Sequence, residues 1–380
     1  MALRRIAGRN VALDLEDGVV RAVLPGDPGE TRWLAPGFVD LQVNGWRGHD
    51  LNAPGLTAET VSAMVAALAR TGTTTLLPTV ITAPEERMTA AVRAIAVACA
   101  NDPRVAAAVA GIHVEGPHVS PNDGPRGAHP LADVRPPDIA LFDRLQAAAD
   151  GRVRMVTLSP HWPESAAYVS ALAARGIRVA IGHTDATRDE ILGAVAAGAT
   201  LSTHLGNGIA AMLPRHPNII WTQLADDRLI ATFIGDGHHL PVDTLKAMIR
   251  AKGPERAVLV SDVTALGGMP PGVYRQSIGG EVELSPVGRL GLRGTPYLAG
   301  AARSLADGVA VTAGVVGMDL ALRMATLNPG AILGGDAGRP VVGRAASLVR
   351  FAWSPGDAHL GIDLVLADGR DVDLADGDGA

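Results

Sequence analysis

The sequence predicts an α/β protein, a (β/α)8 TIM barrel with a small β-sandwich domain formed from both chain termini. Short apolar runs alternate with Ala- and Leu-rich segments of helical periodicity through the middle of the chain. The two ends instead carry short alternating runs separated by Gly, Asp and Pro. Polar residues suited to metal binding or proton transfer stand where several of the apolar runs end.

Eight apolar runs are predicted as the barrel strands, because each is short, apolar and suited to a buried strand. They cover residues 37–43, 73–79, 109–115, 153–159, 177–183, 199–204, 230–236 and 257–262. Helices are predicted at 57–70, 84–100, 163–174, 188–197, 241–252, 299–313 and 319–325. Thr57 and Thr187 are the predicted N-caps of two of these helices. Alternation of strands and helices implies a parallel sheet.

The chain ends predict β-hairpins. The runs 10–15 and 19–24 near the start, and 347–353, 361–367 and 370–374 near the end, alternate in polarity and are bounded by turn formers. The predicted domains are therefore 1–34 with 339–380 for the small β-domain, and 35–338 for the barrel.

Composition excludes several classes of function. The chain has 380 residues, of which 47% are hydrophobic, and a net charge of −6, so no nucleic-acid-binding surface is expected. No apolar stretch approaches ~18 residues free of charges and turn formers, so no membrane span is expected. Cys99 is the single cysteine, which excludes an internal disulfide. We expect a cytoplasmic enzyme acting on a small molecule.

Four residues carry the chemical prediction: Glu115, His183, His204 and Asp262 each stand at or just past the end of a predicted strand. The C-terminal strand ends of a barrel converge on one face, so these groups would make a mononuclear hydrolytic metal site. The alternatives are a solvent-exposed carboxylate for Glu115, core histidines for His183 and His204, and a helix N-cap for Asp262.

Ordered motifs extend over nearly the whole chain. They are PGFVDLQVNG (36–45), HVEGPHVSP (113–121), GAHP (127–130), IGHTDA (181–186), STHLGN (202–207), DGHH (236–239), VSDVTA (260–265), RMATLNPGAILG (323–334) and GRAASLVRF (343–351). In this order they resemble the amidohydrolase superfamily, and within it the N-acetylglucosamine-6-phosphate deacetylase family.

This resemblance implies a metal-dependent deacetylase that converts N-acetylglucosamine 6-phosphate to glucosamine 6-phosphate and acetate, working as a homodimer. Glu115, His183 and His204 would hold one divalent metal, with zinc the leading candidate and iron or manganese suited to the same ligands. Gln42 and Asn44 stand where many amidohydrolases have His-X-His, which resembles the single-metal branch of the family.

The resemblance also implies roles for other side chains. Asp262 would be general base and then general acid, and His129 would contact the acyl carbonyl of the substrate. His239 would help to hold the sugar phosphate. His238 and His113 are expected to be structural neighbours. Ordinary roles are expected for His49, His118, His161 and His359, and His216 is left open.

Two segments depart from the family pattern. In 204–218, an insertion follows His204; there Asn207 and Gly208 would offer amides to an anion, and Arg215 would reach the phosphate across a dimer interface or be an ordinary surface residue. In 294–305 the usual Ser after Ala-Gly is missing. The alternatives are therefore an amidohydrolase of an unphosphorylated N-acyl sugar, an N-acyl amino acid or a cyclic amide, or a non-catalytic binding barrel.

Overall fold

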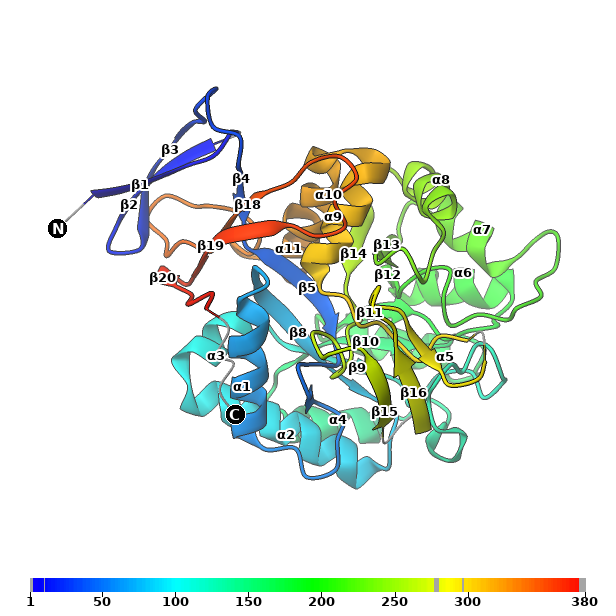
Figure 1. Cartoon of the computed structure of the whole chain (residues 1–380). Helices are drawn as coiled ribbons and strands as arrows, with labels where there is room; N and C mark the ends of the chain where they lie inside the picture. Colours follow the sequence, from blue (N-terminus) through cyan, green and yellow to red (C-terminus); the bar gives the residue numbers. More distant parts are fainter. Residues whose placement is uncertain (1–2, 10, 277–279, 296, 376–380) are drawn as a thin grey trace.

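The central sheet of the computed structural model, which describes residues 3–9, 11–276, 280–295 and 297–375, has eight parallel strands (Figure 1). Their spatial order follows the chain order. The strands are β5 (Phe38–Val43), β8 (Thr73–Ile81), β9 (Ile112–Glu115), β10 (Val153–Leu158), β11 (Arg178–Ile181), β12 (Leu201–Ser202), β13 (Ile230–Ile234) and β14 (Ala257–Val260). All eight predicted strands are confirmed, most of them with shorter bounds.

The sheet closes into a barrel between its first and last strands. Val43, at the end of β5, forms a parallel bridge with Val263, just beyond β14. The amide of Asp262 donates to the carbonyl of Gln42 at 3.0 Å, and the amide of Asn44 donates to Val263 at 2.8 Å. The predicted (β/α)8 barrel is confirmed, and its closure places the end of β5 beside Asp262.

Helices cover the outside of the barrel and follow most of the strands (Figure 1). They are α1 (Ala58–Ala69), α2 (Glu85–Asn101), α3 (Pro103–Ala108), α4 (Ile139–Ala148), α5 (Ser165–Ala173), α6 (Arg188–Ala197), α7 (Ile219–Ala225), α8 (Val242–Lys252), α9 (Leu305–Val316), α10 (Met318–Ala325), α11 (Leu327–Leu333) and the 3-10 turn η1 (Leu131–Asp133). Both predicted caps are confirmed: Thr57 accepts the amide of Thr60, and Thr187 forms a capping box with Glu190. No helix in the described ranges is long and apolar enough to cross a membrane.

The helix predicted at 299–313 begins later, at Leu305. Ser304 accepts the amide of Asp307 at 3.2 Å while Asp307 accepts the amide of Ser304 at 3.0 Å, and this reciprocal cap fixes the start of α9. The segment before it is extended instead, because Ala301 pairs with Val263 at the barrel mouth. This correction moves residues 299–303 from the helical layer to the rim of the barrel.

An antiparallel sheet that the sequence did not predict is inserted after β14. It consists of β15 (Gly272–Gln276), β16 (Gly280–Leu284) and β17 (Leu290–Leu292). Leu266 and Ala302 pack with this sheet from outside it and complete a small apolar cluster. The short hairpin of β6 (Gly45–Trp46) and β7 (His49–Asp50) follows β5.

Strands from both ends of the chain form two further antiparallel sheets (Figure 1). The first consists of β1 (Leu3–Ala7), β2 (Val11–Glu16) and β3 (Val19–Pro25), and the second of β4 (Trp33–Pro36), β18 (Leu348–Ala352), β19 (Gly361–Ala367) and β20 (Arg370–Asp371). β4 pairs with β18 although more than 300 residues separate them, and one apolar cluster joins the two sheets. The predicted β-sandwich of both termini is confirmed; residue 10 of one predicted strand lies outside the described residues.

The domain boundaries stay a prediction, and β4 extends across the boundary placed after residue 34.

At the N-terminal end of the barrel, α11 lies against the first residues of the strands. Ile332 of α11 packs in the cluster of Val39, Leu77 and Leu201 inside the barrel. This helix therefore closes the N-terminal mouth and leaves the C-terminal mouth for a site.

Candidate metal centre and active site

Four polar side chains meet at the C-terminal mouth. Glu115 is the last residue of β9, and His183, His204 and Asp262 each lie two residues beyond the end of β11, β12 or β14. All four line one cavity of about 260 Å³. The sequence prediction that these residues are brought together agrees with their placement.

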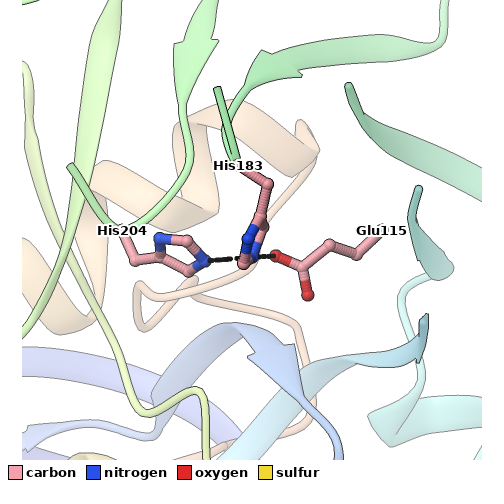
Figure 2. Close-up of side chains that lie close together, drawn as sticks. All are labelled: Glu115, His183 and His204. Atoms are coloured by element: carbon pink, nitrogen blue, oxygen red, sulfur yellow. Dashed lines mark hydrogen bonds and ion pairs between the residues drawn. The ribbon is translucent and has the colours of Figure 1, made fainter. Parts of the chain in front are cut away.

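Glu115, His183 and His204 point at one another from the ends of β9, β11 and β12 (Figure 2). Glu115 Oε1 lies 3.2 Å from Nε2 of His183 and 3.2 Å from Nε2 of His204, and the two nitrogens are 3.1 Å apart. Ligands at ~2.0–2.1 Å from a tetrahedral zinc ion are separated by about 3.3 Å. The three atoms therefore fit one metal ion with a coordination position left for water or substrate.

Two side-chain amides near the end of β5 donate hydrogen bonds to the carboxylates of the site. Gln42 Nε2 donates to Glu115 Oε1 at 3.0 Å, and Asn44 Nδ2 donates to Asp262 Oδ1 at 2.7 Å. An amide that donates in this way orients a carboxylate and does not act as a metal ligand. Within the described ranges, the structure has one cluster of metal-ligating side chains, Glu115 with His183 and His204.

The imidazole of His183 is oriented by its second nitrogen and by two glycines. Its Nδ1 donates to the carbonyl of Pro125 at 2.9 Å, which leaves the Nε2 lone pair for a metal. A Cβ at Gly208 would lie 2.8 Å from His183 Nδ1, and a Cβ at Gly127 would lie 3.1 Å from Cε1. Both glycines also have a positive φ, so the two loops approach the ring closely only with glycine there.

His183, His204 and Asp262 share an uncommon backbone conformation. Their φ angles are 48°, 29° and 51°, in the left-handed region that non-glycine residues seldom adopt, at a cost of order 1–3 kcal/mol each. Hydrogen bonds hold two of these turns: the amide of His204 donates to Thr232 Oγ1 at 2.7 Å, and that of Asp262 donates to Gln42. The conformation turns each side chain into the mouth.

Glu115 and His204 shift each other's pKa in opposite directions. Burial alone would raise the pKa of Glu115, but its hydrogen bonds with His183 and His204 hold that pKa well below its usual range. Burial likewise opposes a charged His204, yet the Glu115 carboxylate outweighs it and raises the pKa of His204. Metal binding therefore competes with protonation of His204.

Asp262 is buried in the cavity wall, and its surroundings shift its pKa. Burial and the neighbouring charge of Glu115 raise the pKa of Asp262 to about 6, against the opposing effects of His204, His239 and Asn44. No helix begins at this residue, because Val263 directly after it pairs with Val43. The alternative interpretation of Asp262 as a helix N-cap is therefore wrong.

Two further histidines line the same cavity. His129 shares a 2.6 Å hydrogen bond between Nδ1 and Thr82 Oγ1, and its ring centroid lies 4.3 Å from that of His183. Burial lowers the pKa of His129 to about 3, so this imidazole is neutral near pH 7. His239 shares a 2.7 Å hydrogen bond from Nδ1 to Asp236 Oδ2, which fixes its ring at the cavity wall.

Of the remaining predicted site residues, two line the cavity and two do not. Asn207 and Gly208 line the cavity, but the backbone amide of Asn207 already donates to the carbonyl of His204 at 3.0 Å. Arg215 is exposed in the 206–218 loop and is absent from the cavity lining. His113 has the expected packed role, since it is fully buried and bonds to Thr157 Oγ1 at 2.8 Å.

Sequence reasoning missed several cavity-lining residues, among them Asp50, Asn52 and Gln276. Leu298 and Gly300 also line the cavity, and they lie in the 294–305 segment that departs from the family pattern. Asn52 had the clearest signal, as a polar residue in the loop after a strand. It donates to Thr79 O at 3.1 Å and accepts the amide of Ile81 at 2.9 Å, which secures the end of β8.

The chain is similar to known proteins along most of its length. Residues 33–372 match the profile of the Amidohydrolase family. Sequence identity is 32% over 352 residues to N-acetylgalactosamine-6-phosphate deacetylase of Escherichia coli O157:H7, covering 89% of each chain. Identity is 36% over 325 residues to N-acetylglucosamine-6-phosphate deacetylase of Homo sapiens, covering 80% of this chain and 75% of the human one.

Solved structures agree with these matches. The N-acetyl-D-glucosamine-6-phosphate deacetylase of Mycobacterium smegmatis superposes with a TM-score of 0.85 at 30% identity, covering 95% of both chains. The barrel and the site at its C-terminal mouth thus define a hydrolase of carbon–nitrogen amide bonds. The chain belongs to the amidohydrolase family, as the ordered motifs in its sequence indicate.

Proposed function

We propose that this enzyme removes the N-acetyl group of an amino-sugar 6-phosphate, converting N-acetylglucosamine 6-phosphate to glucosamine 6-phosphate and acetate. One observation carries the proposal: Glu115, His183 and His204 form a metal-binding triangle that shares a cavity with Asp262. The same reaction is named in relatives such as the human enzyme. A non-catalytic barrel would have no need to retain this strained and complete set.

One divalent metal is proposed at Glu115, His183 and His204, with zinc favoured by the nitrogen-rich ligand set and by the spacing of the three atoms. When bound, such a cation polarises the acyl carbonyl and lowers the pKa of water. The pairing of Gln42 with Glu115 supports a single metal.

Asp262 is proposed to move the proton. Its carboxylate accepts a proton from the attacking water as the oxygen bonds to the acyl carbon, and it then delivers that proton to the nitrogen as the carbon–nitrogen bond breaks. The amine leaves neutral and the acyl group leaves as acetic acid, which releases its remaining proton to solvent to become acetate. His129, neutral and held by Thr82, is proposed to donate a hydrogen bond to the acyl oxygen as negative charge develops there.

The substrate phosphate is proposed to lie near His239, Asn207 and Gly208, which share the cavity wall. Arg215 is too exposed to serve this cavity from its own chain, so its phosphate contact is proposed to be made in the partner subunit of a homodimer. The exposed apolar side chains of Met212 and Trp221, 87% and 55% exposed, flank Arg215 in sequence and support an interface there. We also propose a cytoplasmic location.

A second candidate substrate is the galactose epimer. Two relatives, from Escherichia coli O157:H7 and from Shewanella sp. (strain ANA-3), are named N-acetylgalactosamine-6-phosphate deacetylases and are 32% and 36% identical to this chain. The two sugars differ at one hydroxyl, so both would present the same acetamide and phosphate to the site.

The experiment that tests the proposal follows acetate and free amine together. Metal-loaded enzyme is incubated with N-acetylglucosamine 6-phosphate, and both products are measured by proton NMR over time. We expect acetate and glucosamine 6-phosphate in equal amounts, and none with the Asp262→Asn variant. Absence of acetate from both phosphorylated epimers would leave an unphosphorylated N-acyl sugar, an N-acyl amino acid or a cyclic amide as the substrate class.

A further inference from the structure

A second, larger cavity of about 740 Å³ opens at the other end of the barrel, beside α11. Its wall includes the first residues of β11, β12 and β13, which are Arg178, Leu201 and Ile230. The metal-binding triangle lies past the opposite ends of these strands. The second cavity is therefore separate from the active site, and its use does not depend on the proposed deacetylase function.

Arginines dominate the charged lining of this cavity. Arg178, Arg228, Arg323 and Arg339 line it, and Glu255 is the one acidic residue in the lining. A smaller cavity of about 200 Å³ shares Arg178 and Ile332 with it and adds Arg154. The N-terminal mouth thus concentrates positive charge in a chain whose net charge is −6.

Only part of this positive charge is neutralised. Arg228 makes two hydrogen bonds to Asp226, at 2.9 and 2.6 Å, and Arg323 lies 3.4 Å from Glu255. In the described ranges, Arg178 and Arg339 form no ion pair, and neither does Arg154. Three guanidinium groups therefore remain for an anion.

Two of the guanidinium groups are held in place by neutral groups. Arg178 Nε donates to the carbonyl of Ile332 at 3.2 Å, and Arg323 Nε donates to Asn328 Oδ1 at 3.2 Å. Asn328 is itself fixed, since its Nδ2 donates to the carbonyl of Ala257 at 2.7 Å. These contacts use one N–H of each arginine; they leave both terminal nitrogens of Arg178 to bind a ligand, and Nη1 of Arg323 beside the Nη2 that faces Glu255.

We propose that this arginine groove, defined by the unpaired Arg178 and Arg339 together with Arg154 of the adjoining smaller cavity, binds a nucleoside diphosphate. The planar forks of arginine match phosphate oxygens, and several of them spread along one groove suit a ligand with more than one phosphate. Leu327, which is 37% exposed, and the half-buried Ile230 supply an apolar surface on which a base or ribose can pack. The volume lies within the ~300–1,000 Å³ of small-molecule sites.

Titration calorimetry of the metal-loaded enzyme with ADP tests the site, with adenosine as the uncharged comparison. We expect about one ADP per chain, affinity that falls as salt rises, and no measurable binding of adenosine. The Arg178→Gln/Arg339→Gln variant should weaken ADP binding about tenfold or more, because two charge-assisted contacts are lost. Arg93→Gln/Arg250→Gln, which removes the same charge from exposed positions on α2 and α8, should bind ADP as wild type does.

Three results would overturn the proposal: no ADP binding to wild-type enzyme at millimolar concentration, equal loss in both double variants, or binding that persists in Arg178→Gln/Arg339→Gln. The last result would assign the binding to another site, such as the active-site cavity. Should the double variant unfold, Arg339→Gln alone repeats the test, because its exposed side chain makes no described contact that the fold needs. The single variant should weaken ADP binding several-fold, and an unchanged affinity for ADP would contradict the proposal.

Discussion

Asn44 donates a hydrogen bond from Nδ2 to Oδ1 of Asp262 at 2.7 Å, across the closure of the barrel between β5 and β14. A donor to a carboxylate favours its ionised form, whereas burial and the charge of Glu115 disfavour it. The balance puts the pKa of Asp262 at about 6, so the carboxylate is ionised, and able to accept a proton, near neutral pH. If Asp262 is the base, as proposed, Asn44 would position its carboxylate and contribute to lowering its pKa.

This relationship predicts the pH dependence of the reaction. Asp262 must be ionised to act as base, so kcat/KM should fall as the pH drops below about 6. Replacing Asn44 with Ala removes the donor that lowers the pKa of Asp262, and the acid limb of the profile should move to higher pH. The measurement is kcat/KM between pH 5 and 9 for both enzymes. An acid limb at the same pH in both would remove Asn44 from this role.

The Asp262→Asn variant should keep the fold and the metal but lose nearly all turnover. An amide is nearly isosteric with the carboxylate and cannot carry the proton, and general acid–base groups contribute typically ~10²–10⁴-fold. Turnover is compared with metal content and thermal midpoint in the same preparation. Activity within about threefold of wild type, against that expected range, would show that Asp262 is not the proton carrier.

The fully active enzyme should contain one divalent metal per chain. Replacing His183 or His204 with Asn should abolish tight binding, since each supplies one of three ligand atoms. Both imidazoles must be unprotonated to bind a metal, so metal retention should decline as the pH falls. Elemental analysis of the active protein provides the measurement, and two equivalents in fully loaded enzyme would contradict the single site.

Metal removal should also lower stability. A ligand at 100 times its Kd stabilises the folded state by about 2.7 kcal/mol, so chelation should lower the thermal midpoint and zinc should restore it. Glu115→Gln should remove most of this metal-dependent shift. An identical midpoint with and without chelator would show that no tightly bound metal supports the fold.

Arg215→Ala should selectively raise the KM of phosphorylated substrates. A phosphate contact made equally in the ground and transition states mainly raises KM when it is lost. The KM of an unphosphorylated acyl sugar should change little, and Arg250→Ala provides a control for loss of an exposed positive charge. Equal effects on both substrates, or no preference of wild type for the phosphorylated sugar, would rule out the phosphate contact.

Deleting the segment after Gly338 should destabilise the N-terminal strands. β18 lies between β19 and β4, and its loss would expose Leu34 and the apolar cluster shared by both chain ends. Burial of each apolar side chain of this size contributes ~1.5–3 kcal/mol to stability. The truncation should therefore lower the free energy of unfolding several-fold more than one core substitution does. Limited proteolysis at β1–β4 and the thermal midpoint measure the effect. A soluble and fully active truncation would contradict the shared domain.

The strands and several helix starts of the barrel could be predicted because each is marked by residues close together in the sequence. Each strand is an apolar run, and Thr187 with Glu190 marks a helix start within four residues. The inserted β15–β17 sheet was missed because its burial depends on Leu266 and Ala302, outside the insertion. The start of α9 was missed because Ala299–Arg303 looks helical by composition, whereas pairing of Ala301 with Val263 makes it extended.

The candidate site also has residues that local sequence patterns predict and partners that they do not predict. Glu115 and His183 stand at strand ends, so the convergence of a barrel was enough to bring them together. The partners that tune them, such as Gln42 on Glu115, depend on how the barrel closes, and no local pattern reports that. Arg178 and Arg339 meet at one groove only through the packing of α11, so nothing in the sequence around either residue marks it.

The central claim is that this site deacetylates a phosphorylated amino sugar with one bound metal. The direct test is the initial rate of amine release from N-acetylglucosamine 6-phosphate, its galactose epimer and unphosphorylated N-acetylglucosamine, with elemental analysis of the same sample. We expect kcat/KM to be at least about tenfold higher for a phosphorylated sugar, because a phosphate contact contributes on the order of one charge-assisted hydrogen bond, and we expect one metal per chain. Fully metal-loaded protein that releases no amine from either phosphorylated sugar would contradict the claim.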